Sequence, residues 1–280
     1  MPFAHINGMN LNYEIAGTGP AVVFLHGGNG NARDWANQIP VLSPKYKVIA
    51  LDIQGHGKSE ATKSEDEYSI PILAEDVLGL LNLLGIRKCC LVGHSFGGFI
   101  SLQFAVTHQD KLAGLVLVDT ASGQYRGDPK TGPLTKKLQE LASTKGMEAV
   151  FEYDARHNPE KVEKFKQHPE LKEISRRTML MMSVSAYIWG SKTVAKWQPV
   201  TPRLSEIKVP TMIVRGEEDL RFAEPVEILR KGIAGSVLTT IKGVGHSPHQ
   251  DAPQIFNQAL LQFLARVWSS ENPDQRLQMI

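Results

Sequence analysis

The chain has 280 residues, of which 42% are hydrophobic and 21% charged, and its formal net charge is +2. This length allows one large α/β domain with a sizeable core. A charge so close to zero favours neither a nucleic acid nor a membrane surface as a partner. The first ten residues, MPFAHINGMN, lack the basic start and apolar stretch of a signal peptide. We therefore expect a cytoplasmic protein.

The chain begins with a predicted hairpin over residues 3–16, in which Asn7-Gly8 supplies the positive φ values of a two-residue turn. Apolar runs of strand length then recur, near-continuous as in strands covered on both faces. They are Val22–Leu25, Val48–Leu51, Cys89–Val92, Leu115–Val118, Met212–Val214 and Val237–Ile241. Segments with helical spacing lie between or after them, at Ile72–Leu84, Phe96–Val106 and Ile255–Val267. This alternation predicts an α/β fold with a mainly parallel sheet flanked by helices.

The only two cysteines, Cys89 and Cys90, are neighbours in one of these runs. On a strand their side chains point to opposite faces, so a disulfide between them would be strained. Because no CxxC or Cys/His cluster surrounds them, we expect reduced core thiols without a metal or nucleophilic role.

The alternation is interrupted once, over residues 121–202, where no strand run occurs and helices are predicted. This stretch holds 14 Lys and Arg against 9 Asp and Glu, a dispersed excess that is typical of a solvated helical face. It ends in an aromatic and Met-rich part that includes Tyr187, Trp189 and Trp197. We therefore predict a core of residues 1–120 and 203–280 with a helical insertion between them.

The motif Gly93-His94-Ser95-Phe96-Gly97 lies between a predicted buried strand and a predicted helix. A strand that reverses into a helix within one residue strains the middle residue, and small neighbours let the two elements approach each other. Such a turn lifts the Ser95 hydroxyl to the carboxyl end of the sheet, where ligands of open α/β folds bind. Ser95 is thus the candidate nucleophile.

A serine hydroxyl needs a base to remove its proton, and the base needs an acid that holds its tautomer. Asp219 and His246 follow two successive predicted strands late in the chain. The order serine, acid, histidine is that of the nucleophile-elbow hydrolases. Glu217, Glu218 and Asp119, which also follow strands, are further candidates for the acid.

A developing oxyanion needs two backbone N–H donors. One is expected from Phe96, the residue after the nucleophile. The other is expected from the glycine-rich loop at residues 26–31, HGGNGN, in which we favour Gly28.

Five motifs in this order resemble those of the α/β-hydrolase fold family, over nearly the whole chain. They are HGG at 26–28, DIQGHGKS at 52–59, GHSFGG at 93–98, GEED at 216–219 and GHSP at 245–248. The resemblance implies a mostly parallel sheet of the eight-stranded type and a catalytic triad of Ser95, Asp219 and His246. It also implies that residues 121–202 form a cap domain, in which Tyr187, Trp189 and Trp197 would roof the substrate pocket. The alternative is that these aromatic residues form the core of the cap itself.

The other histidines near these motifs are expected to be structural. His94 and His26 would pack beside the two loops, and His56 belongs to a turn motif. His249 is expected to be a solvated loop residue.

The resemblance implies a serine hydrolase of small to medium, moderately hydrophobic carboxylic esters or lactones that uses no metal and no cofactor. Serine at position 95 argues against the dehalogenases and epoxide hydrolases, which use an aspartate nucleophile. The C–C bond hydrolases of ring-cleavage products usually carry a G-P-G element in the oxyanion loop, from which Asn29-Gly30-Asn31 departs. A third possibility is a ligand receptor that keeps the triad and turns over slowly.

Overall fold

The computed structural model describes residues 2–123 and 132–271, and eight strands in it form one sheet in the order β1-β2-β4-β3-β5-β6-β7-β8. The strands are β1 (Phe3–Ile6), β2 (Met9–Ala16), β3 (Ala21–Leu25), β4 (Lys47–Leu51), β5 (Cys89–His94), β6 (Leu112–Val118), β7 (Thr211–Gly216) and β8 (Val237–Ile241). The pairs β1–β2 and β2–β4 are antiparallel, and all others are parallel. The predicted, mostly parallel sheet is confirmed.

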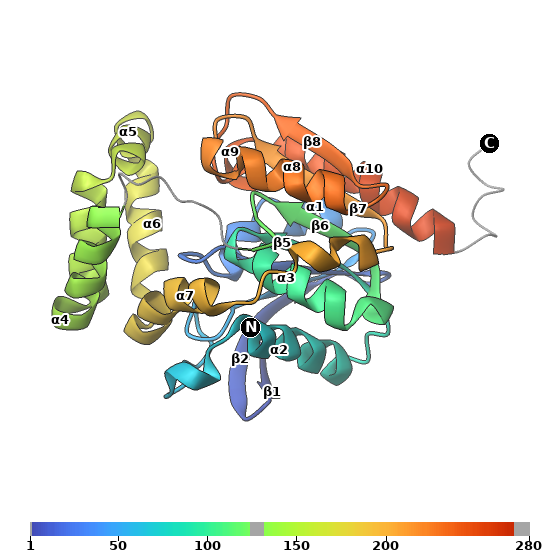
Figure 1. Ribbon diagram of the computed structural model, residues 1–280, viewed down its shortest axis with the longest axis horizontal. Coiled ribbons are helices and arrows are strands. Elements are labelled where there is room, and N and C mark those ends of the chain that lie inside the picture. Colours follow the sequence, from blue (N-terminus) through green and yellow to red (C-terminus); the bar gives the residue numbers. More distant parts are fainter. Residues whose placement is uncertain (1, 124–131, 272–280) are drawn as a thin grey trace.

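Helices cover both faces of this sheet (Figure 1). On one face they pack into the core that contains Val23 and Leu25, and on the other into the core that contains Val22 and Phe24. The first layer consists of α2 (Ile70–Leu83), α3 (Phe96–Thr107) and α8 (Ala223–Gly232), and the second includes α1 (Ile39–Leu42), α9 (Pro248–Asp251) and α10 (Pro253–Glu271). Because alternate residues of β3 enter the two cores, the strand needs apolar side chains on both faces.

The first hairpin forms as expected. Asn7 and Gly8 both have positive φ, 49° and 81°, which a two-residue turn of this kind requires. Cys89 and Cys90 are free thiols buried within β5.

Between β6 and β7 every element that the structure describes is a helix. The helices are α4 (Gly132–His157), α5 (Pro159–Gln167), α6 (Glu170–Leu180) and α7 (Val184–Lys196), followed by the 3₁₀ helix η5 (Thr201–Glu206). The helices α4, α5 and α6 stand beside the sheet, and α7 lies between them and the core (Figure 1). The N–H of Ser183, which caps α7, donates to the carbonyl of Gly55 at 2.7 Å, so this helix begins against the turn after β4.

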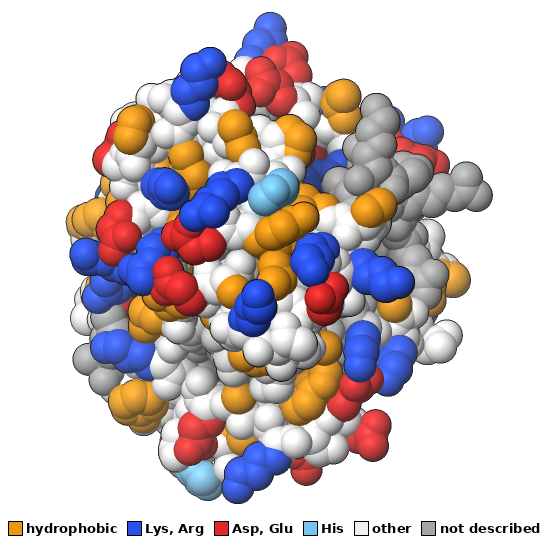
Figure 2. Space-filling view, turned by 90° about the vertical axis from the view of Figure 1, so that its left-hand side faces the viewer, with side chains coloured by type: hydrophobic (Ala, Val, Ile, Leu, Met, Phe, Trp, Pro, Cys, Tyr) orange, Lys and Arg blue, Asp and Glu red, His pale blue; other side chains and the backbone are white. Residues whose placement is uncertain are grey.

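The surface over α4–α6 carries Lys and Arg side chains interspersed with Asp and Glu (Figure 2). Several of them are paired, as in the contact of Arg176 with Glu148 at 2.7 Å. No single-sign patch is visible on this face. None of the helices within residues 2–123 and 132–271 has both the length and the apolar character that a membrane crossing requires.

Candidate active site

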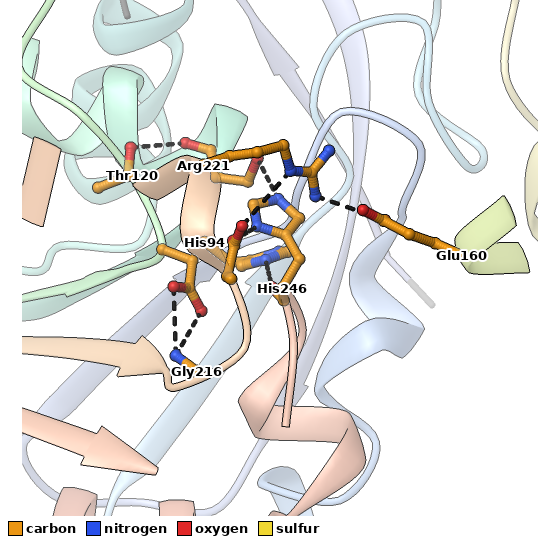
Figure 3. Close-up of polar contacts among 9 residues, drawn as sticks. His94, Thr120, Glu160, Gly216, Arg221 and His246 are labelled. Atoms are coloured by element: carbon orange, nitrogen blue, oxygen red, sulfur yellow. Dashed lines mark hydrogen bonds and ion pairs between the residues drawn. The ribbon is translucent and has the colours of Figure 1, made fainter. Parts of the chain in front are cut away.

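Ser95 lies in a strained turn between β5 and α3. Its φ is 49°, one of only three positive values among the described residues that are not glycine. Its N–H donates to the carbonyl of Val118 at 2.9 Å. Its own carbonyl accepts from Thr120 Oγ1 at 2.9 Å (Figure 3). A Cβ at Gly97 would overlap the carbonyl oxygen of Leu25 in β3. The local sequence thus permits a conformation that the neighbouring strands hold in place.

His246 links Ser95 to Asp219 (Figure 3). Its Nε2 lies 2.9 Å from Ser95 Oγ, and its Nδ1 is hydrogen-bonded to Asp219 Oδ2. Because an ionised carboxylate only accepts, the ring proton belongs on Nδ1. Nε2 is then free to accept the proton of the serine hydroxyl. These three residues, from the loops after β5, β7 and β8, are the ones that the sequence singled out.

The carboxyl of Asp219 is 1% exposed. Burial by itself raises its pKa, but the hydrogen bond and charge of His246, together with Arg221, outweigh this effect and hold the pKa below its ordinary value. Asp219 is therefore ionised at neutral pH, as a partner of a histidine base must be.

Asp119, a second candidate for the acid, lies at the end of β6 and accepts from the Gly216 N–H at 3.1 and 3.2 Å (Figure 3). Burial, and then the nearby charge of Asp219, raises its pKa to about 8. Glu217 and Glu218, which follow β7 directly, are exposed. The hydrogen bond to His246 comes from Asp219, so the geometry favours Asp219 as the acid.

The loop after β3 lies beside Phe96, since a Cβ added at Gly28 would be 3.8 Å from the Cβ of Phe96. The Gly27 carbonyl accepts hydrogen bonds from His26 Nδ1 at 2.7 Å and from the Gly30 N–H at 3.0 Å. Because N–H and C=O oppose each other across a trans peptide, the Gly28 N–H points the other way. Among the described residues, neither this N–H nor that of Phe96 has an acceptor. Their role as an oxyanion hole stays a prediction.

Comparison with known proteins places the chain among hydrolases. Residues 20–253 match the α/β hydrolase fold family. The chain belongs to this family. This hydrolase is 32% identical over 258 residues to a 2-hydroxy-6-oxononadienedioate/2-hydroxy-6-oxononatrienedioate hydrolase of Klebsiella pneumoniae, and the match covers 88% of this chain and 87% of the relative.

Solved structures with a similar fold include an enol-lactonase and an esterase. The enol-lactonase from Burkholderia xenovorans LB400 has a TM-score of 0.83 and 26% identity, over 94% of this chain and 100% of that one. A thermophilic esterase from Thermogutta terrifontis has a TM-score of 0.82 and 26% identity, over 95% and 98% of the two chains. The hydrolase thus resembles proteins that are named for different reactions.

Two histidines of this hydrolase hold backbone carbonyls of the site loops, and a third is placed differently from its prediction. His56 Nε2 lies 2.9 Å from the carbonyl of Gly28 and so anchors the glycine loop. His94 Nε2 lies 2.6 Å from the backbone carbonyl of His246. The prediction for His249 is wrong, because its ring is fully buried and stacks on Trp35 with centroids 4.3 Å apart.

The three aromatic residues predicted to line the pocket lie in different surroundings. Trp189 is half-buried and contacts Tyr68, whose ring is parallel to that of Phe96 with centroids 6.5 Å apart. Trp197 is buried against Phe99, and its Nε1 donates to Gln103 Oε1 at 2.8 Å. Tyr187 is half-buried, and burial raises the pKa of its hydroxyl. Trp189 is connected through Tyr68 to Phe96, the residue after the nucleophile. Contact with substrate stays a prediction for all three.

One group of possible metal ligands occurs in the described part of the chain, formed by Asp119, Asp219 and His246, whose ligand atoms lie within 4.8 Å of one another. Both ring nitrogens of His246 are already hydrogen-bonded to Ser95 and Asp219. The arrangement is therefore that of an acid–base network.

Proposed function

We propose that this hydrolase cleaves carboxylic esters or lactones of small to medium, moderately hydrophobic molecules through an acyl-enzyme on Ser95. The observation that carries the proposal is the position of His246, with Nε2 at 2.9 Å from Ser95 Oγ and Nδ1 bonded to Asp219. A base in this position can activate a hydroxyl that would otherwise be a poor nucleophile.

In the proposed reaction, Ser95 Oγ forms a bond to the substrate carbonyl carbon while its proton passes to His246 Nε2. Asp219 stabilises the resulting imidazolium, and the N–H groups of Gly28 and Phe96 donate to the oxyanion. The bond to the leaving alcohol then breaks as His246 protonates the alcohol oxygen. Water then attacks the acyl carbon while its proton passes to His246. The bond between this carbon and Ser95 Oγ breaks as His246 returns the proton to Oγ, which releases the acid and restores Ser95. These steps need no metal or cofactor.

The comparisons support this choice through the enol-lactonase and esterase folds. The helices α4–α7 would act as the cap over the site. The chain of rings from Trp189 through Tyr68 to Phe96 favours an apolar wall for the acyl or alcohol group.

A second candidate is hydrolysis of a C–C bond in a ring-cleavage product. It is favoured by the Klebsiella pneumoniae relative, which is named a dienedioate hydrolase. The same base and nucleophile serve either reaction, so the two candidates are distinguished by which substrate the protein turns over.

The test is a screen of short-chain nitrophenyl esters, lactones and a dienoate ring-cleavage product with wild type and Ser95→Ala. We expect ester or lactone turnover that falls roughly 10⁴-fold or more in Ser95→Ala. The matched control is Ser143→Ala, since Ser143 is exposed on α4. Equal rates for wild type and Ser95→Ala would contradict the proposal. Turnover of the dienoate alone would favour the second candidate, and a single slow turnover would favour a ligand receptor.

A further inference from the structure

We propose that Arg221 is a positioning residue for the catalytic acid and that it ties the acid to helix α5. This inference rests on the proposed hydrolysis. Arg221 lies in the 3₁₀ helix η6 (Leu220–Phe222), two residues after Asp219. The sequence offered no signal for it, because its second partner is 61 positions away in the chain.

The first contact holds the acid. Arg221 Nε donates to Asp219 Oδ1 at 3.4 Å, while Asp219 Oδ2 is bonded to His246 (Figure 3). Each oxygen of this buried carboxylate thus has its own nitrogen partner. The next residue, Phe222, stacks on the His246 ring with centroids 5.0 Å apart. One turn of η6 therefore presents a cation to the acid and an aromatic face to the base.

The second contact reaches across to α5. Arg221 Nη2 lies 3.7 Å from Glu160 Oε2, at the start of that helix (Figure 3). Lys164, four residues later, lies on the same side of the helix and donates to Asp251 Oδ1 at 2.9 Å. Asp251 ends α9, directly after the loop that carries His246.

Helix α5 thus offers a negative side chain to Arg221 in η6, just after Asp219, and a positive side chain to Asp251 in α9, just after the loop that carries His246. Both η6 and α9 come from the core, whereas α5 belongs to the segment between β6 and β7. The two contacts are partly exposed, so each is weak for stability. Their consequence is geometric, because movement of α5 acts on Asp219 through Arg221 and on the His246 loop through Asp251.

The first experiment replaces Arg221 by Met and by Lys. We expect Arg221→Met to lower kcat about tenfold and to leave KM within about twofold, since the acid acts on the reaction rather than on substrate binding. Arg221→Lys, which keeps the charge, should recover most of kcat. The matched control is Arg230→Met on α8, where Arg230 pairs with Glu227 at 2.9 Å. Urea unfolding of each variant verifies that it is folded.

The labelling rate of Ser95 by a small fluorophosphonate gives a readout without substrate, and it should fall in parallel with kcat. If Ser95→Ala is inactive while Arg221→Met keeps full kcat and labelling rate, the inference is overturned and the proposed function stands. If Ser95→Ala stays active, the proposed function fails first.

The second experiment reverses the charges of the α5 contact. Lys164→Asp and Asp251→Lys should each lower kcat about threefold, and the double variant should recover it, because the pair is restored with opposite polarity. Unchanged kcat in both single variants would overturn the role of α5.

Discussion

At the scale of single residues, the two buried aspartates near His246 have opposite roles. Asp219 is bonded to the ring and ionised, whereas burial raises the pKa of Asp119 to about 8. Asp219→Asn should therefore lower kcat about 10⁴-fold, because the amide would favour the wrong tautomer of His246. Asp119→Asn resembles the protonated acid and should stay within about threefold of wild type at pH 7. Steady-state kinetics of the two variants verify this, and equal losses would mean that both aspartates act as the acid.

At the scale of elements, the strand-to-helix turn at Ser95 depends on the closeness of α3 and β3. Gly97→Ala would press a methyl group against the carbonyl oxygens of Leu25 and His26. We expect a loss of about 1–3 kcal/mol of unfolding free energy and a fall in kcat, because α3 must move away from the sheet. In Gly190→Ala, the control on α7, the new Cβ would have no heavy atom within 4 Å. A urea midpoint for Gly97→Ala equal to that of the control would contradict the expectation.

The elements that the sequence predicted are those with local signals. The turn at Asn7-Gly8 and the strands formed by the apolar runs are determined by residues close together in the chain. The same holds for the turn at Ser95, which depends on the glycines beside it. Arg221 and His249 have no such signal, since their roles come from Glu160 and Trp35 on distant elements. The order of loops along the chain was enough to place Asp219 and His246 at one edge of the sheet, but not to show what surrounds them.

At the scale of the whole molecule, the dependence of stability on pH reflects two opposing sets of buried or half-buried groups. Four histidines are buried and have a lowered pKa, mainly because burial disfavours their charged form: His26, His56, His94 and His249. Three aspartates have a raised pKa, also mainly through burial: Asp34, Asp76 and Asp119. Below pH 6.5 the unfolded chain binds more protons at the histidines, whereas the native chain binds more at the aspartates. The two sets partly cancel, so a stability curve of the wild type alone reveals little.

The difference in unfolding free energy between wild type and a variant isolates the contribution of one titratable group, here His249. Neither ring nitrogen of His249 has a hydrogen-bond partner among the described residues, and its pKa is lowered to about 3, so Phe can replace it on Trp35. Below pH 6.5 the histidine gains a proton in the unfolded chain but not in the native protein. As the pH falls, the unfolding free energy of wild type should therefore decrease relative to that of His249→Phe. The relative loss should reach about 2 kcal/mol between pH 7 and pH 5. Urea unfolding at both pH values measures it, with the exposed His168→Gln as control. A constant difference between wild type and His249→Phe would mean that His249 is protonated in the native protein, or is not buried as the structure has it.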